Sequence, residues 1–244
     1  ARPDYFDLVP YEYYNSDQDD NNTPEVEVGN SNLNATVSNN FDIMAEKYVG
    51  NTSILSGGLF YKSLDNWIYT YSTSNFDYLN DGNAVYDYTQ KRNGSNAKVF
   101  GFEVAVQKQL TDNLNLAANY TFTDSSTDNI LEERNDVPLV GAVENMYNVS
   151  LAYETGKFFA RISYNYAGEQ LDELGGAAWE DRYYDEQKFL DLNASYNLTD
   201  KIRLFAEAKN LTNQPLRYYQ GEKAKTMQLE YYQMSWNLGL KIDL

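Results

Sequence analysis

The 244-residue sequence predicts an all-β fold, a transmembrane, antiparallel, up-and-down β-barrel. Three observations predict it. Apolar and polar residues alternate in one run after another, the five prolines all fall at segment ends or in polar stretches, and very short connections alternate with long polar ones. Alternation with a period of two is typical of strands that have one apolar and one polar face.

Ten segments are expected to be strands. The alternation is less regular in the first three, which are 1–10, 39–49 and 53–71, and the third contains Gly57-Gly58. It is regular in the other seven, which are 100–107, 114–123, 147–153, 158–166, 190–198, 202–209 and 234–244. Alternation alone leaves open whether the apolar faces point into the core of a soluble sandwich or outward into lipid.

The connections favour lipid. The short ones are Gly50-Asn51-Thr52, Thr111-Asp112-Asn113, Thr155-Gly156 and Thr199-Asp200-Lys201, and the long ones are about 11–38, 72–96, 124–142, 168–187 and 212–228. In an up-and-down meander, this order places every tight turn at one end of the strands. Outer-membrane barrels have short periplasmic turns and long extracellular loops. We therefore expect a multi-pass barrel in the outer membrane of a Gram-negative bacterium, with the lipid bilayer as partner.

Tyrosines occur near the ends of the apolar runs, where the aromatic girdles of such a barrel would lie. Five of them are Tyr120, Tyr147, Tyr164, Tyr166 and Tyr196. In a soluble protein, the same residues would be ordinary core or edge residues.

The composition excludes several functions. The chain has no histidine and no cysteine, so it contains no Ser-His-Asp or Cys-His nucleophile and no imidazole or thiolate zinc site. The net charge of -17 opposes binding to nucleic acid, because affinity for DNA or RNA comes mostly from Lys and Arg. Paired carboxylates could still catalyse, but no such pair stands out at one end of the expected strands, and we expect no enzyme.

Five motifs occur in order along the chain: RPDYFDLVPY at 2–11, GNSNL at 29–33, SNNFDIMAEKY at 38–48, GLFYK at 58–62 and FAEAKNLTN at 205–213. Together they resemble the barrel of TonB-dependent outer-membrane receptors, most closely those of Bacteroidota. In that family, an arginine-proline strand end precedes a glycine-asparagine segment, and the penultimate strand commonly ends in a phrase like Asn210-Leu211-Thr212-Asn213. The resemblance extends over essentially the whole chain.

The resemblance implies a 22-stranded barrel with an N-terminal plug, of which residues 1–244 would be the C-terminal part, about ten strands. It further implies energised import of a scarce nutrient, such as an iron chelate, cobalamin, a saccharide or a peptide. TonB would act through the N-terminal region, which we expect to lie upstream of Ala1. The barrel-assembly machinery would read the C-terminal strand, although Leu244 stands where the family commonly has an aromatic residue.

Two long segments, 168–187 and 212–228, contain aromatic and basic side chains that suit an organic ligand or an anionic chelate. The candidate ligand-binding residues are Trp179, Tyr183, Tyr184, Arg217, Tyr218 and Tyr219. The alternative interpretation is that these side chains pack one loop against the other.

Six charged residues fall on the polar faces, which would point into the lumen of a barrel. They are Glu103, Arg161, Asp191, Arg203, Glu207 and Lys209. The resemblance implies that they contact the plug, and contact with water is the alternative.

The run 17–22 clusters oxygen ligands of the kind that Ca²⁺ prefers, with Asp17, Asp19 and Asp20 as the candidates. It lacks the glycine and the distal glutamate of an EF-hand, and a solvated loop is the alternative. No other cofactor is expected.

Two alternatives to energised import stay open at this point. The first is a complete small barrel that acts as a passive channel. The second is a structural subunit of a larger surface complex, since function depends on the site and not on the fold.

Overall fold

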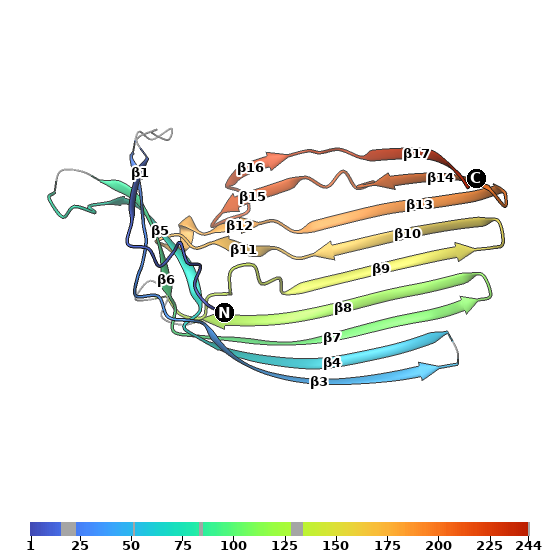
Figure 1. Ribbon diagram of the computed structural model, residues 1–244, viewed down its shortest axis with the longest axis horizontal. Helices are drawn as coiled ribbons and strands as arrows, with labels where there is room; N and C mark the ends of the chain where they lie inside the picture. The colour runs from blue at the N-terminus through green and yellow to red at the C-terminus, as the bar shows by residue number, and fades with distance from the viewer. Residues whose placement is uncertain (16–22, 51, 83–84, 128–133, 244) are drawn as a thin grey trace.

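The computed structural model describes residues 1–15, 23–50, 52–82, 85–127 and 134–243 (Figure 1). Its long strands form one nine-stranded antiparallel sheet in the order β17-β14-β13-β10-β9-β8-β7-β4-β3. These strands are β3 (Val37–Val49), β4 (Ser53–Asp65), β7 (Asn96–Thr111), β8 (Leu114–Thr127), β9 (Asn145–Glu154), β10 (Phe158–Ala167), β13 (Gln187–Thr199), β14 (Ile202–Lys209) and β17 (Ser235–Ile242). Each neighbouring pair is antiparallel, as predicted for an up-and-down meander.

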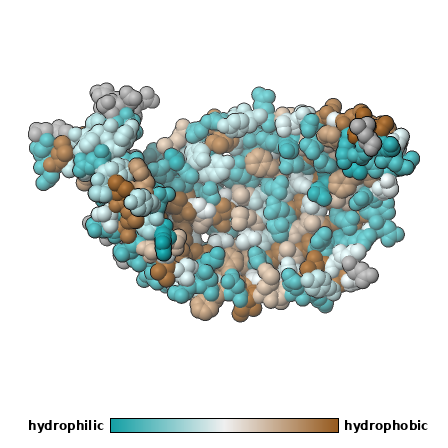
Figure 2. Space-filling view, in the orientation of Figure 1, coloured by the Kyte–Doolittle hydropathy of each residue, from teal (hydrophilic) through white to brown (hydrophobic). Residues whose placement is uncertain are grey.

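One face of this sheet is apolar from strand to strand. The register pairs Leu116 with Leu151, Leu151 with Ile162, and Ile162 with Leu192, so these side chains form one row across four strands. Leu151, Ile162 and Leu192 of this row are exposed rather than covered, and on the two edge strands Ile43 is 75% and Leu238 is 78% exposed. Hydrophobic side chains reach the surface over the long strands in Figure 2. A sandwich would bury such a face under a second sheet, whereas an outer-membrane barrel turns it to lipid.

Aromatic residues border the apolar face. The register aligns Tyr120 with Tyr147 and Tyr147 with Tyr166, and the last two rings stack at 4.7 Å. Towards the other end, Phe158 lies opposite Tyr196. The eight-residue step from Phe158 to Tyr166 corresponds to about 27 Å along β10, comparable to the apolar band of about 25 Å on outer-membrane barrels. Four of the five tyrosines predicted near the ends of the apolar runs, Tyr120, Tyr147, Tyr166 and Tyr196, thus border the apolar face, and their place at a membrane interface stays a prediction.

Two small sheets lie together at one end of the long strands, called the loop end here (Figure 1). The first, in the order β1-β2-β6-β5, consists of β1 (Glu12–Asn15), β2 (Glu25–Val28), β5 (Ile68–Phe76) and β6 (Tyr86–Asn93). Strands β2 and β6 are parallel, whereas the other strand pairs in the described ranges are antiparallel. The second sheet, in the order β11-β12-β15-β16, consists of β11 (Gln170–Glu173), β12 (Arg182–Tyr184), β15 (Leu216–Gln220) and β16 (Thr226–Glu230).

The opposite end, called the turn end, contains the short connections. Strand β3 ends at Val49 and β4 begins at Ser53. The turns that follow β7, β9 and β13 are similarly short. The predicted sorting of short and long connections to opposite ends is therefore confirmed.

Nine of the ten expected strands are present, and the expectation of a strand at 1–10 is wrong. Residues 5–9 form turns, with the amide of Val9 bonded to the carbonyl of Phe6 and that of Phe6 to the Asp4 carboxylate. Pro3 and Pro10 lack the amide hydrogens that a ladder needs. The expected run 53–71 divides at Asn66, whose φ of 55° ends β4 before β5 begins.

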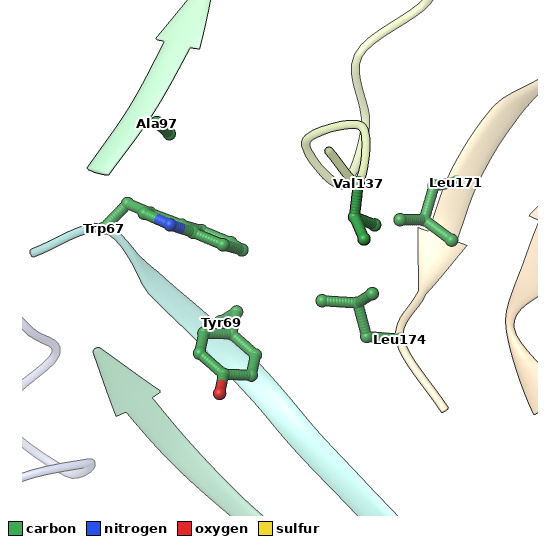
Figure 3. Packing of buried hydrophobic residues seen from close by; sticks show 6 residues of the cluster. All are labelled: Trp67, Tyr69, Ala97, Val137, Leu171 and Leu174. Atoms are coloured by element: carbon green, nitrogen blue, oxygen red, sulfur yellow. The ribbon is translucent and has the colours of Figure 1, made fainter. Parts of the chain in front are cut away.

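The hydrophobic core lies at the loop end, in contrast to the exposed apolar face of the long strands. It consists of Trp67, Tyr69, Ala97, Val137, Leu171 and Leu174 (Figure 3). Trp67 immediately precedes β5, and the others come from β5, β7, β11 and the segments that follow β8 and β11, so the core joins several long connections into one unit. The described residues contain no helix long and apolar enough to cross a membrane.

Candidate functional site

The candidate site is a cleft at the loop end. It measures about 470 Å³ and lies between the β5–β6 hairpin and the sheet that contains β11, β12 and β15. The 3₁₀ helix η1 (Ala178–Glu180) contributes Trp179, whose side chain is 61% exposed. Thr73 and Tyr88 line the side of the hairpin, and Glu173 and Arg182 line the other side. The volume is in the range of sites for organic ligands, which is about 300–1,000 Å³.

The backbone just before η1 approaches its neighbours closely, and this approach places η1 against the cleft. A Cβ at Gly175 would collide with Glu180, and a Cβ at Gly176 would lie 3.1 Å from both the Glu180 carboxylate and the Thr73 hydroxyl. The Glu180 carboxylate also accepts a hydrogen bond of 2.9 Å from the amide of Ala177. The two glycines thus allow the turn before η1 to pack against Glu180 and β5.

Four of the predicted ligand-binding residues pair with one another. Tyr183 lies opposite Tyr219 with rings stacked at 5.2 Å, and Tyr184 lies opposite Tyr218 at 4.9 Å. The hydroxyl of Tyr219, a residue only 3% exposed, donates to Glu169 at 2.9 Å. These four rings pack loop against loop, which is the alternative considered from the sequence.

Burial sets the chemistry of these phenols. It raises the pKa of Tyr183 and Tyr184, and it raises the pKa of Tyr219 together with the hydrogen bond to Glu169. Each phenol therefore keeps its proton well above neutral pH. Neutral, stacked phenols are structural here rather than phenolate ligands for a metal.

Arg217 is held by its own loop. Its guanidinium contacts Asp185 at 2.9 Å, donates to Thr226 and also donates to the carbonyl of Lys223. Lys223 in turn contacts Glu169 at 2.7 Å. Arg217, the predicted cation for an anionic chelate, and its neighbour Lys223 are thus both engaged by carboxylates. Of the six predicted ligand-binding residues, the cleft includes Trp179.

Three ion pairs at this end, made by two arginines, were not foreseen from the sequence. Arg134 makes a bidentate contact with the buried Asp181, at 2.8 and 2.5 Å, and Arg182 contacts Asp172 at 2.6 Å and Glu173 at 3.0 Å. Asp181 flanks η1, and Arg182 lines the cleft. The partners of the first pair are 47 residues apart, so no local pattern could have revealed it.

The six charged residues predicted to face the lumen lie on the polar face of the sheet. Arg161 lies opposite Asn193, and Asn193 lies opposite Glu207 and donates to its carboxylate at 3.2 Å. Arg203 donates to Asn197 at 2.8 Å, and Asp191 accepts the amide of Asn210. Glu103 is opposite Gly58 on β4, and Lys209 is opposite Ser235 on β17.

The polar face is hollowed towards the turn end. A cleft of about 640 Å³ there is lined by Arg203, Glu207, Lys157 and Lys241, among others. The structure thus brings Arg203 and Glu207 into one hollow, while Glu103, Asp191 and Lys209 lie outside it.

The candidate Ca²⁺ ligands Asp17, Asp19 and Asp20 lie outside the described residues. Within the part of the chain that the structure describes, no group of three or more acidic side chains is placed to hold a metal ion. The Ca²⁺ site stays a prediction from the sequence.

Comparison with known proteins identifies relatives. Residues 1–211 match a family model described as the β-barrel of TonB-dependent receptor-like proteins. An iron-regulated outer membrane virulence protein of Vibrio cholerae serotype O1 is 26% identical over 133 residues, which are 53% of this chain and 20% of the relative.

Solved structures have the same fold. A variant of the ferric enterobactin receptor PfeA from Pseudomonas aeruginosa aligns over 99% of this chain and 36% of its own, with a TM-score of 0.66 and 18% identity. The ferric-catecholate import receptor Fiu of E. coli K12 aligns over 85% of this chain and 27% of its own, with a TM-score of 0.60 and 14% identity. The chain thus spans about a third or less of the length of these relatives. A specific likeness to receptors of Bacteroidota stays a prediction.

Proposed function

The chain belongs to the TonB-dependent receptor family, as part of its β-barrel, and we propose that the natural protein imports a ferric chelate through the outer membrane by TonB-driven transport. The match of the family model over residues 1–211 carries the proposal. The exposed apolar face and its aromatic borders support a place in the outer membrane. The family model and the two solved relatives are receptors by name, in agreement with the expectation that the chain is no enzyme.

An iron chelate is the substrate class that the relatives favour among those considered from the sequence. The Vibrio cholerae relative is iron-regulated by name, and the two structural relatives are receptors for ferric enterobactin and a ferric catecholate. Cobalamin, saccharides and peptides have no counterpart among these names. The loop-end cleft, with its exposed Trp179, would receive part of the chelate before import.

Two regions of the sheet would serve partners of the transport cycle. The hollow of the polar face that contains Arg203 and Glu207 would contact a plug, because opposite charges and amides there offer several hydrogen bonds. The last strand, β17, would be read by the barrel-assembly machinery. TonB would act on the plug through a region outside residues 1–244.

Uptake of radioactive iron in the native organism tests the proposal. Deletion of the gene should lower uptake of a ferric siderophore, and collapse of the proton gradient should reduce uptake in the parent strain to the level of the deletion. Uptake that depends on the gene but survives loss of the gradient would favour a passive channel. Equal uptake with and without the gene, for a panel of ferric siderophores, would contradict the iron-chelate assignment.

A further inference from the structure

The charged lining of the loop-end cleft is unbalanced. Among the described residues, three carboxylates line it, from Asp87, Glu173 and Glu180, against the one guanidinium of Arg182. No lysine is among these described lining residues. A concave surface lined by one sign of charge concentrates ligands of the opposite sign.

The guanidinium of Arg182 is already occupied. Its Nη2 lies 2.6 Å from Asp172 and its Nη1 lies 3.0 Å from Glu173, while its Nε also donates to Asp172. The same guanidinium lies over the ring of Tyr218 at 5.4 Å. An anionic ligand would therefore compete with two carboxylates for this group, and it would gain little from it.

The other two carboxylates of the cleft are those of Asp87 and Glu180, and no cation is paired with them in the described part of the chain. Among the ion pairs of the described residues, none includes Asp87 or Glu180. Glu180 accepts one backbone hydrogen bond, from Ala177, which leaves acceptor capacity on its carboxylate. The two carboxylates lie on different walls of the cleft, since Asp87 is on β6 and Glu180 is in η1.

The other lining groups suit an organic cation. The exposed indole of Trp179 can take an ammonium group against its ring face, and a tryptophan ring is the strongest partner for such a contact. The hydroxyls of Ser72, Thr73 and Thr89 supply neutral hydrogen-bonding groups on the β5–β6 side. A carboxylate on each wall and an aromatic ring at the rim form a site for a protonated amine.

We propose that the loop-end cleft binds a protonated amine through Asp87, Glu180 and Trp179, and that the ferric chelate carried by this receptor is one with a cationic arm rather than an anionic tris-catecholate. This inference rests on the proposed function, because it names the class of chelate that the same protein would carry. It separates this chain from the catecholate receptors that it resembles in fold.

The test is equilibrium binding to the purified full-length receptor at low ionic strength. Three probes differ in charge: ferrioxamine B, which bears a pendant protonated amine, its N-acetylated form, which lacks that charge, and ferric enterobactin, which is an anionic tris-catecholate. Ferrioxamine B should bind about fivefold more tightly than the acetylated form, the ratio expected for a partly exposed charge pair. The ratio should fall as salt is added.

Variants locate the effect. The double variant Asp87→Asn with Glu180→Gln keeps the shape of both side chains and should bring the ratio of the two ferrioxamine affinities close to one. The matched control Glu222→Gln removes an exposed carboxylate outside the cleft and should leave the ratio unchanged.

The outcomes separate the two proposals. Equal affinities for all three chelates, or a ratio that persists in the double variant, would overturn the inference while leaving iron-chelate transport in place. Tighter binding of ferric enterobactin would do the same. Failure of all three chelates to bind would overturn the iron-chelate function and this inference with it.

Discussion

Asp181, which is 1% exposed, is held by both terminal nitrogens of Arg134, and this pair joins the segment after β8 to the segment that contains η1. The carboxylate also accepts the amide of Gly175 at 3.0 Å. A buried charge with this many partners fixes the turn before η1, and hence one wall of the loop-end cleft.

Replacement of Asp181 by Asn should loosen the loop end. The change leaves the Arg134 charge without its partner, and breaking a buried pair costs about 3–5 kcal/mol. Hydrogen exchange of the amides in 170–184 should become faster. The control Asp172→Asn removes a more exposed partner of Arg182 and should cost less than about 1 kcal/mol. Equal exchange rates in the two variants would contradict the role of the buried pair.

The phenol of Tyr78 links the tip of the β5–β6 hairpin to β1. Burial, and after it the hydrogen bond of 2.8 Å to Glu12, raises its pKa from 10.0 to about 12. Because the folded pKa is raised, the stabilising contribution is complete below pH 10 and is lost as the pH rises through about 12.

Difference absorbance of the phenolate between the parent protein and Tyr78→Phe should therefore reveal one group that ionises near pH 12. In Glu12→Gln, the Tyr78 phenol should ionise at lower pH. The nearby negative charge is removed, and the hydrogen-bond acceptor becomes neutral. A titration of Tyr78 that is the same in the presence and absence of Glu12 would contradict this assignment.

Ile162 lies midway between the aromatic borders of β10, on the apolar face. Arginine there would place a charge near the middle of the bilayer and should cost about 2–4 kcal/mol of folding free energy. The control Ser163→Arg puts the same side chain on the polar face and should cost much less. Urea unfolding of the full-length protein in liposomes measures both changes. Similar losses at the two positions would argue against a lipid-facing apolar side.

Gly101 lies opposite Phe60 in the β4–β7 pair, and a Cβ at this position would collide with the carbonyl of Phe122 and the Phe60 ring. Gly101→Ala should therefore impair folding, because a backbone atom cannot move aside. Gly57→Ala, on the same strand pair, meets nothing closer than 3.7 Å and should fold normally. An unheated gel measures the fraction of each variant that stays folded. Equal fractions for the two variants would show that the close approach at Gly101 is not needed for folding.

The sequence allowed the long strands to be predicted because period-two alternation is a local signal. The same signal predicted which residues of β10 lie on each face. The connection lengths predicted that the short turns and the long loops lie at opposite ends of the strands. Residues 1–10 were wrongly predicted to be a strand because they contain several apolar residues, although their alternation is irregular and Pro3 and Pro10 cannot donate to a ladder.

The loop end could not be predicted in this way. Its pairings depend on residues distant in sequence, such as Tyr183 with Tyr219 and β2 with β6. Aromatic composition suggested ligand capture for Tyr183 and Tyr219, but only their mutual stacking shows that they support the loops. The charge balance of the cleft arises likewise from β6, β11 and η1 together, which no single segment displays.

The nine-stranded sheet should stand in the outer membrane with its apolar face towards lipid and its polar face towards water. Because the chain contains no cysteine, a single spin label at position 162 or 163 can be introduced cleanly within it. The label at 162 should be relaxed mainly by oxygen dissolved in lipid, and the label at 163 mainly by a water-soluble nickel complex. Equal access of the nickel complex to both positions, or the reverse order, would contradict a barrel wall with its apolar face in the bilayer.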